Sequence, residues 1–317
     1  MRARVMWALS LAVLFVGSRA VLAQRPAPRF DLQGTWNGST RTPLQRPQQF
    51  IDRFAFTPEE AAEYLRATPD RVRNRLPTAA DRLVQIDLDE TYSEVERMPL
   101  DGLRTSLIVD PPSGMLPPLL PAAQARKANR PKRSLEDPET FGLAERCLLG
   151  NFGASGGSLA SPPMIPSEII PSLYRIVQTD THVLIFTEWV HDARIVRLNG
   201  THLPPGIRSW LGDSIGHYEG ETLVVDTTNF RPDTHSLDSG DRLHVVERFT
   251  RVNAKMLRYR VTIEDPDTWA TPWTAEWPFT ATDVALFPVE CHEGNYAMEN
   301  MLKGSRAEER RAQGTRP

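Results

Sequence analysis

The sequence predicts a mainly β protein whose C-terminal half is an antiparallel β-barrel, preceded by an irregular proline-rich region and followed by a helix. Between residues 172 and 290, eight short runs of β-branched and aromatic residues are separated by turn residues. Two of these runs alternate between apolar and polar residues, which indicates strands with one face on a core. Residues 24–150 are rich in proline, whereas the sequence after Asn295 has a helical pattern.

Residues 1–23 form a predicted signal peptide. Arg2 and Arg4 precede an apolar run at residues 5–16, and Ala23 suits the cleavage position. The apolar run is shorter than the ~20 residues that span a bilayer. We therefore expect a periplasmic or secreted protein without membrane insertion. Its mature chain would consist of the proline-rich region at residues 24–150 and a barrel domain with the C-terminal helix at residues 151–317.

The composition argues against nucleic acid as a partner. The chain has a formal net charge of -3, and removal of residues 1–23 with their three arginines makes it -6. Such a mild negative charge does not suit a polyanionic partner. Hydrophobic residues make up 40% of the chain, which is enough for a substantial core. The sequence makes no prediction of oligomeric state.

The chain has two cysteines, Cys147 and Cys291. Cysteines of an exported protein tend to pair. A disulfide between these two would close a loop of more than a hundred residues and stabilise the fold by up to about 5 kcal/mol. The alternative is that Cys291 is a nucleophile beside His292, although an exposed thiolate would be oxidised in that compartment.

Residues 24–163 contain a few local signals of structure. The segment FDLQGTWNGS predicts a short strand. FTPEEAAEYLRA begins a helix, because Thr57 can cap it, Pro58 suits its first turn and Glu60 completes a capping box. SLIVDPPSGMLP predicts a strand, a turn and a return strand, and the glycine-rich residues 150–163 predict a loop.

The eight predicted strands are short and joined by turns. In two of them one face is wholly apolar, and we expect both faces to line the core. These faces are Leu257, Tyr259, Val261 and Ile263, and Trp273, Ala275, Trp277 and Phe279. The eight runs are SLYRIVQ, HVLIFTEW, RIVRL, ETLVVDTTNF, LHVVERFTRV, MLRYRVTIED, WTAEWPFT and VALFPVE.

All seven histidines lie after residue 181, and the first candidate group is EWVHDAR. The spacing of Glu188 and His191 suits a metal pair only on a helix, and this segment is strand and turn. Glu188 and Arg194 can instead form a cross-strand ion pair, with His191 at the rim of the barrel, where barrels often bind ligands. The histidines are His182, His191, His202, His217, His235, His244 and His292.

The second group surrounds the hairpin HYEGETLVVDT. Trp210 and Asp213 precede it and are candidate ligand contacts. Ser214, His217 and Asp226 could be combined as a hydrolase triad, although no nucleophile elbow surrounds the serine. Asp226 either faces the interior as a functional carboxylate or satisfies backbone groups at the end of its strand.

The third group is RLHVVERFTRV. Glu247 shares a face with apolar residues, so burial of that face would place a carboxylate in surroundings suited to proton transfer. Burial of the opposite face would bring His244 and Arg248 inward together. A strand of a closed barrel must direct one of these two faces inward.

The stretch CHEGNY precedes the predicted helix. If a disulfide fixes Cys291, His292 and Glu293 would point at the mouth of the barrel. Asn295 would then cap a helix whose N-terminal N–H groups favour an anion. We expect this helix, YAMENMLKGSRAEERRA, to pack across one end of the barrel.

Several of these motifs resemble an uncharacterised family of secreted bacterial proteins. The resemblance covers residues 146–307 and rests on EWVHDARIVRLNGTHLPP, GDSIGHYEGETLVVDTTNF, HVVERFTRV, EDPDTWATPWTAEWPF and CHEGNY. The GTW at residues 34–36 is similar to the Gly-x-Trp signature of lipocalins, which implies a lipocalin-like or calycin-like barrel. The family resemblance implies a shared set of polar residues and no particular reaction.

These features predict an exported barrel that binds a small apolar or aromatic molecule and favour an acid–base enzyme, a lyase, isomerase or hydrolase, without a redox cofactor. Arg194 would hold an anionic part of the ligand. The candidate bases are Asp226 and Glu247, and the candidate acids or oxyanion donors are His217, His244 and His292. Two alternatives remain, a non-catalytic lipocalin-like carrier and a metal-dependent enzyme that uses clustered histidines.

Overall fold

The computed structural model describes residues 31–67, 97–130, 134, 136–143, 146–149, 151–152, 157–158, 162–166, 172–188, 191–232, 236–287, 291–292 and 296–314. The predicted signal peptide lies outside these residues, and so do Glu293 and Asn295 of the CHEGNY stretch. Within the described part of the chain, no helix combines the length and the apolar character needed to cross a bilayer.

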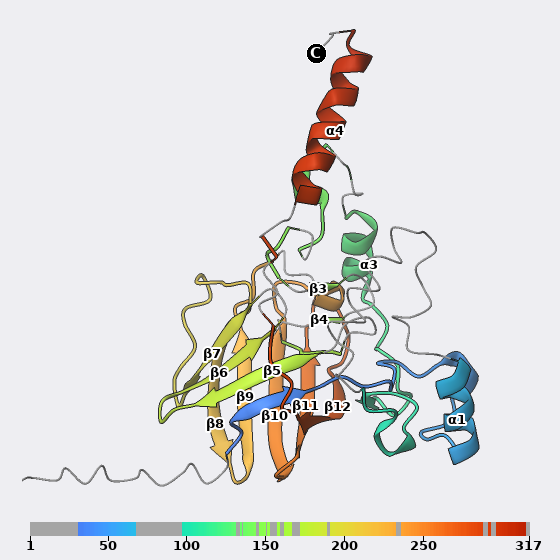
Figure 1. The fold of residues 1–317 in the computed structure, drawn as a ribbon, viewed down its shortest axis with the longest axis vertical. Coiled ribbons are helices and arrows are strands. Elements are labelled where there is room, and N and C mark those ends of the chain that lie inside the picture. The colour runs from blue at the N-terminus through green and yellow to red at the C-terminus, as the bar shows by residue number, and fades with distance from the viewer. Residues whose placement is uncertain are drawn as a thin grey trace, which may run out of the picture.

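Nine strands of the described chain form a closed barrel, which confirms the predicted fold class (Figure 1). β1 pairs with both β5 and β12, and this double pairing closes the sheet. In order around the barrel, the strands are β1 (Gly34–Asn37), β5 (Leu173–Gln178), β6 (His182–Thr187), β7 (Ala193–Leu198), β8 (Asp213–Glu219), β9 (Thr222–Thr228), β10 (His244–Asn253), β11 (Met256–Glu264) and β12 (Trp273–Ala281).

Smaller strands add to this frame. β2 (Ile108–Asp110) pairs with the first half of β12, and β1 pairs with its second half. β3 (Asn151–Phe152) and β4 (Gly157–Ser158) form a separate two-stranded sheet. The barrel sheet therefore draws β1 and β2 from the proline-rich region before residue 151.

One neighbouring pair in the barrel is parallel. Val196 of β7 lies opposite Ser214 of β8, and the two strands run in the same direction. The connection at residues 199–212 makes this possible, because it carries the chain back to the end at which β7 began. The expected meander of antiparallel neighbours is interrupted at this point, and the long connection comes to lie beside the barrel wall.

Large apolar side chains fill the barrel. Both apolar faces predicted from the alternation on β11 and β12 point inward, and every residue of the two faces is 0% exposed. On β10 the face that carries Glu247 is buried, whereas His244 and Arg248 face outward and are partly exposed. Burial contributes about 1.5–3 kcal/mol for each large apolar side chain, so the alternation fixes which face is inside.

The predicted N-terminal elements are mostly confirmed. β1 contains the expected GTW, and the Trp36 indole N–H donates to Leu32 O at 2.8 Å. At the start of α1 (Pro58–Ala67), Glu60 N–H donates to Thr57 Oγ1 at 3.2 Å and Thr57 N–H donates to Glu60 Oε2 at 2.9 Å, as a capping box requires.

The predicted return strand after β2 is wrong. The described residues 111–118 contain no strand, and β2 pairs with β12 instead. α3 (Pro121–Ala128) follows, where the sequence suggested no helix. Short 3-10 helices lie at Gln48–Phe50, Asp101–Leu103, Pro138–Thr140 and Ser236–Asp238.

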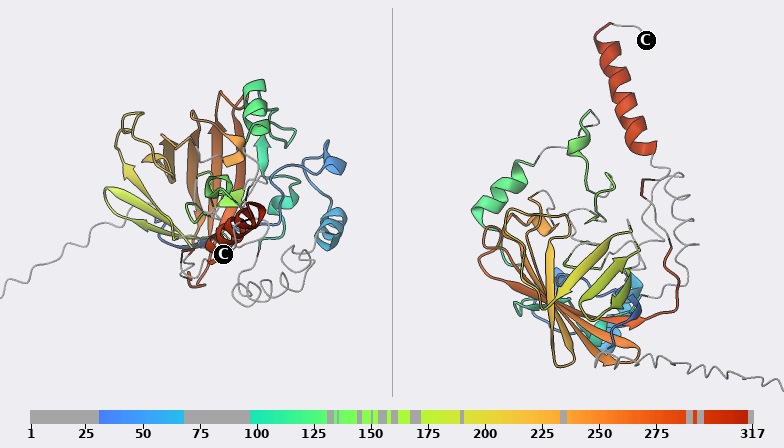
Figure 2. Two further views of the ribbon diagram at one scale, coloured as in Figure 1. Left: turned by 90° about the horizontal axis from the view of Figure 1, so that it is seen from above. Right: turned by 90° about the vertical axis from the view of Figure 1, so that its left-hand side faces the viewer.

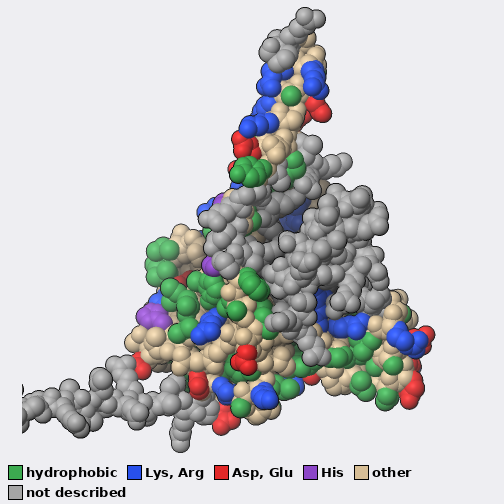
Figure 3. All heavy atoms as spheres, in the orientation of Figure 1, with side chains coloured by type: hydrophobic (Ala, Val, Ile, Leu, Met, Phe, Trp, Pro, Cys, Tyr) green, Lys and Arg blue, Asp and Glu red, His purple; other side chains and the backbone are tan. Residues whose placement is uncertain are grey.

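The C-terminal helix α4 (Tyr296–Ala312) forms as predicted, but it does not lie across the barrel. Figures 1 and 2 show it projecting away from the strands, and Tyr296 at its start is 67% exposed. Lys and Arg side chains along the helix explain this, because they leave little apolar area to bury (Figure 3). The predicted strand VALFPVE is also wrong over residues 284–287, which contain no strand, and residues 288–290 lie outside the described chain.

Cys147 and Cys291 form a disulfide with a Cα–Cα distance of 5.5 Å, as predicted. The alternative of a Cys291 nucleophile is therefore wrong, because its sulfur is already bonded. The disulfide joins the segment before the β3–β4 hairpin to the segment before α4.

Candidate functional site

The barrel interior contains a buried ion pair. Arg194 on β7 and Glu247 on β10 both point inward, with side chains 3% and 0% exposed. Arg194 Nη2 donates to Glu247 Oε1 at 3.0 Å, and Nη1 donates to Oε2, so the contact is bidentate. Burial acts to lower the pKa of Arg194, but the charge and hydrogen bonds of Glu247 outweigh it and raise the pKa. The arginine therefore remains charged inside the barrel.

Tyr259 completes a group of three with this pair. Its hydroxyl donates to Glu247 Oε1 at 2.8 Å and accepts a hydrogen bond from Met164 N–H at 3.2 Å. Burial, together with the charge of Glu247, raises the pKa of Tyr259 well above its usual value, so the hydroxyl stays protonated. We call Arg194, Glu247 and Tyr259 the interior triad.

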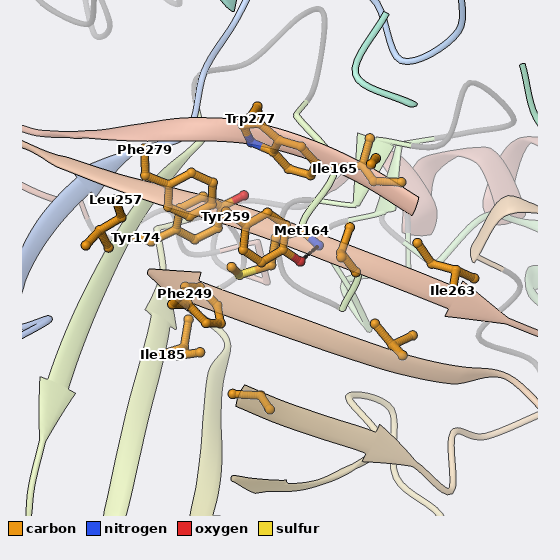
Figure 4. Close-up of a cluster of buried hydrophobic side chains, with 14 of the residues drawn as sticks. Met164, Ile165, Tyr174, Ile185, Phe249, Leu257, Tyr259, Ile263, Trp277 and Phe279 are labelled. Carbon is orange, nitrogen blue, oxygen red and sulfur yellow. Dashed lines mark hydrogen bonds between the residues drawn. The ribbon is translucent and has the colours of Figure 1, made fainter. Parts of the chain in front are cut away.

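Aromatic rings surround Tyr259, the aromatic member of the interior triad (Figure 4). The centroid of the Tyr259 ring lies 4.7 Å from that of Trp277, 5.1 Å from that of Phe279 and 5.0 Å from that of Phe249. Tyr174 stacks on Phe279 at 5.2 Å. Tyr259, which is hydrogen-bonded to Glu247, therefore links the triad to an aromatic enclosure built by β5, β10, β11 and β12.

Met164 fills the middle of this enclosure. Its side chain is 1% exposed and lies among the aromatic rings in Figure 4. Its Sδ is 3.8 Å from Arg194 Nη2. The residue belongs to the described segment 162–166, which is neither helix nor strand. A methionine side chain is unbranched and adaptable, and its sulfur is only a weak acceptor.

Asp192 lies at the turn between β6 and β7. Thr187 N–H donates to the Asp192 carbonyl at 2.9 Å, so the two residues are opposite each other and share the face of the buried Thr187. The Asp192 Oδ2 atom accepts no hydrogen bond from the described residues. Burial raises the pKa of Asp192 to about 6. A carboxyl group that titrates near neutral pH is suited to proton transfer.

A second polar group lies on the outer face of the barrel. His202 and His244 each place Nε2 3.0 Å from Asp226 Oδ1. Asp226 and His244 lie on β9 and β10, whereas His202 comes from the 199–212 connection. The hydrogen bond to Asp226 raises the pKa of His244 against the effect of burial. Burial acts to raise the pKa of Asp226, but the two histidines lower it. We call these three residues the outer cluster.

Asp213 on β8 supports the outer cluster. Its Oδ2 atom lies 3.0 Å from His202 Nδ1 and accepts a hydrogen bond from Leu203 N–H at 2.8 Å. Arg197 donates to both carboxylate oxygens, at 2.7 and 3.2 Å. Burial acts to raise the pKa of Asp213, but hydrogen bonds from Arg197, Leu203 and His202 hold it at about 2. The charged Asp213 therefore fastens the 199–212 connection to the barrel wall.

Glu188 and Arg194 do not form the predicted pair. Glu188 is 2% exposed and accepts a hydrogen bond from Phe287 N–H at 2.8 Å. Arg194 reaches across the barrel instead, because its strand directs it inward. His191 lies in the turn with a φ of 53°, and its ring packs edge-on against Phe186 at 5.2 Å.

Three other predicted residues belong to neither the interior triad nor the outer cluster. His217 is exposed and lies 3.1 Å from Glu219. His292 is exposed beside the disulfide. The Trp210 ring lies 4.3 Å from the guanidinium of Arg231, a cation–π contact.

The residues predicted to act together in catalysis lie on opposite faces of the barrel sheet. Ser214 faces inward and shares a hydrogen bond with Thr227 at 2.9 Å, whereas Asp226 faces outward, so the hydrolase triad is not assembled. Glu247 lies inside the barrel, and Asp226 and His244 lie outside it. Within the described residues, no group of three His, Cys, Asp or Glu side chains is arranged to hold a metal ion.

Sequence reasoning missed several members of these groups. Tyr259 could have been found, because pairing β10 with β11 places it opposite Phe249, two residues from Glu247 on the same inward face. His202 lies in a loop whose path depends on the parallel β7–β8 pair. Met164 has no signal in its local sequence, since its position depends on a segment outside regular structure.

Comparisons with protein-family models, with curated proteins and with solved structures give no match to this chain. The resemblance of its motifs to secreted bacterial proteins therefore stays a prediction.

Proposed function

We propose that the protein binds a small, largely apolar or aromatic molecule inside the barrel, beside the interior triad. The observation that carries this proposal is the bidentate Arg194–Glu247 pair, buried among aromatic rings. Ligand sites in small barrels commonly combine apolar and aromatic walls with a few polar groups that fix orientation.

The energetics of the pair support a role in recognition. Two charges lose their hydration when they are buried, and apolar side chains of similar size in their place are often equally stable or more stable. Arg194 and Glu247 lie on different strands and are both almost fully buried. A barrel selected for stability alone would not need them.

Acid–base catalysis on the bound molecule is a second candidate, and Asp192 is the observation that favours it. Its raised pKa of about 6 suits a group that gains and loses a proton near neutral pH. Glu247 accepts hydrogen bonds from both Nη atoms of Arg194 and from Tyr259, so we assign it to holding the site. The reaction class would be a lyase, isomerase or hydrolase reaction.

Export is part of the same proposal. The disulfide between Cys147 and Cys291 supports it, because disulfides form and persist mainly in oxidising compartments. The N-terminal pattern of basic, apolar and small residues supports it independently.

Binding is tested with prodan, a neutral naphthalene ketone whose emission moves to shorter wavelength in apolar surroundings. Titration of the purified protein should give a saturable blue shift. The binding position is read from the methyl resonances of methionine-labelled protein, with Met164 assigned through Met164→Leu. We expect the Met164 signal to shift and that of Met256, at the start of β11, to stay. Absence of saturable binding, or a shift confined to Met256, would contradict the proposal.

A further inference from the structure

Three buried hydrogen-bond donors near the interior triad have no acceptor among the described residues. They are Arg194 Nε, Trp277 Nε1 and the Tyr174 hydroxyl. Their residues are 3%, 0% and 1% exposed. Burial raises the pKa of Tyr174 and the nearby Ser172 hydroxyl lowers it in part, yet neither hydroxyl makes a hydrogen bond of normal geometry. Buried donors are normally paired, so this group calls for an acceptor.

The donors belong to one region of the barrel. Tyr174 and Trp277 both pack on Phe279, with ring centroids 5.2 and 6.2 Å away. The charge of Glu247 raises the pKa of Tyr174 and the charge of Arg194 lowers it, so the Tyr174 hydroxyl lies near the ion pair. Figure 4 shows Tyr174, Trp277 and Phe279 in one group, with Met164 beside them. A single small molecule could therefore meet several of the donors.

Met164 occupies the position that an acceptor would take. Its Sδ lies 3.8 Å from Arg194 Nη2, and a thioether is a poor acceptor. Nη2–H and Nε–H point from the same edge of a guanidinium group. The sulfur bonds to Nη2 and not to Nε, so a ligand oxygen that lies closer to this edge than the sulfur does would meet both Nη2–H and the unpaired Nε–H. The Met164 side chain comes from segment 162–166 and not from a strand. It can therefore move aside without breaking hydrogen bonds between the strands of the barrel.

The charge of the site selects a neutral acceptor. Glu247 already neutralises Arg194 through two hydrogen bonds. A carboxylate in the ligand would add a negative charge without a partner in a dry interior, which is costly. The pairing with Glu247 therefore argues against the predicted role of Arg194 in holding an anionic group.

We propose that the bound molecule is a neutral aromatic compound whose carbonyl-type oxygen displaces the Met164 thioether and accepts hydrogen bonds from Arg194 Nε and its neighbouring donors. The inference rests on the proposed function of binding inside the barrel. It adds the chemical class of the ligand and identifies Met164 as the side chain that gives way.

Three naphthalenes of similar size test the class of ligand. Acetylnaphthalene has a neutral carbonyl, ethylnaphthalene has no polar group and naphthoate has a carboxylate. Each is measured by displacement of prodan from the purified protein. We expect acetylnaphthalene to bind about tenfold or more tightly than both others, because it alone offers a neutral acceptor to several donors.

Variants that remove one donor test its position. Trp277→Phe and Tyr174→Phe keep an aromatic ring, and each should weaken acetylnaphthalene about three- to tenfold and leave ethylnaphthalene unchanged. Tyr218→Phe is the matched control, because the Tyr218 hydroxyl is already bonded to Gln178 Nε2. Met164→Ala should strengthen the binding of acetylnaphthalene, because it removes the competing side chain.

The outcomes separate this inference from the function on which it rests. If ethylnaphthalene or naphthoate binds as tightly as acetylnaphthalene, the interior binds ligands but the acceptor inference is wrong. If the donor variants weaken all three compounds equally, the inference also fails. If none of the compounds binds, even to Met164→Ala, both the inference and the proposed function are overturned.

Discussion

Glu247 is a carboxylate without access to water, and its ionic partner determines what a substitution there would do. On folding, Arg194 and Glu247 lose their hydration and gain charge-assisted hydrogen bonds to each other. Glu247 also accepts a hydrogen bond from the Tyr259 hydroxyl. Loss of one partner leaves the other charge buried and uncompensated. Loss of both leaves an apolar interior.

Glu247→Gln is therefore expected to cost about 3–5 kcal/mol of unfolding free energy, because Arg194 loses its counter-charge. The double variant Arg194→Met/Glu247→Leu should be close to the wild type or more stable. Urea denaturation measures both, with Glu276→Gln on the outer side of β12 as the control. Equal losses in the single and the double variant would contradict this account of the pair.

Asp192 makes the stability of the folded protein depend on pH. Its folded pKa of about 6 lies above the unfolded value near 4, so the folded state binds the proton more tightly. Stability from this group is therefore present at low pH and is lost as the pH rises through about 6. Asp192→Asn should remove this loss, so the variant gains stability over the wild type at about pH 8 but not at about pH 4. Equal differences at both pH values would count against the assignment.

Single residues of the site were predictable only where alternation reveals a face. The inward position of Glu247 follows from its apolar neighbours on β10. Its partner does not follow, because Arg194 is 53 residues away and meets it across the closed barrel. The converse case is Asp226. It was expected either to face the interior or to satisfy backbone groups at the end of its strand, but it faces outward and binds His202 from the 199–212 connection.

At the scale of elements, the outer cluster attaches a loop to the barrel. His202 bridges Asp213 on β8 and Asp226 on β9, and His244 on β10 binds the same oxygen of Asp226. His244 also faces Glu264 on β11 at 3.6 Å. The connection that makes the β7–β8 pair parallel is therefore fastened by histidine and aspartate side chains.

The outer cluster should stabilise the fold most in mildly acidic solution. The pKa of His244 is raised, so its contribution is complete below the unfolded value of about 6.5 and is lost as the pH rises through the folded value. The pKa of Asp226 is lowered, so its contribution is lost only as the pH falls through its folded value. Asp226→Asn should thus cost more stability at about pH 6 than at about pH 9 in urea denaturation.

Glu276→Gln supplies the control for that comparison, because Glu276 contacts Arg258 and Arg260 and no histidine. Its cost should change little between the two pH values. A cost of Asp226→Asn that is the same at both, or larger at the higher pH, would show that the histidines do not contribute through their charge.

Local sequence predicted elements better than their pairing. The capping box of α1 and the strand at GTW depend on residues close together in the chain. The closure of the barrel by β1 and the parallel β7–β8 pair depend on contacts between distant segments, which local propensity does not contain. The prediction of a return strand after β2 was wrong for the same reason, because β2 pairs with the distant strand β12.

At the scale of the whole molecule, the disulfide joins segments 144 residues apart. Its main effect is on the unfolded chain, where it closes a long loop. Replacement of both Cys147 and Cys291 by serine should lower the unfolding free energy by up to about 5 kcal/mol. Chemical denaturation with and without reductant measures this, and a wild type insensitive to reductant would contradict it once reduction of the disulfide has been verified.

The overall arrangement was predictable where composition alone determines it. A β-rich half, two paired cysteines and a polar C-terminal helix all follow from residue types and spacing. The placement of α4 away from the barrel, and of Met164 inside it, follows from the surfaces that remain after the barrel has closed. Those surfaces are properties of the folded molecule.

A crystal structure of the protein with acetylnaphthalene would show whether the barrel interior binds a neutral aromatic molecule in the place of Met164. We expect the naphthalene ring among Tyr174, Tyr259 and Trp277, the ligand oxygen within hydrogen-bond distance of Arg194 Nε, and the Met164 side chain moved away from its present position. A ligand bound elsewhere, or Met164 unmoved with the ligand present, would contradict the claim.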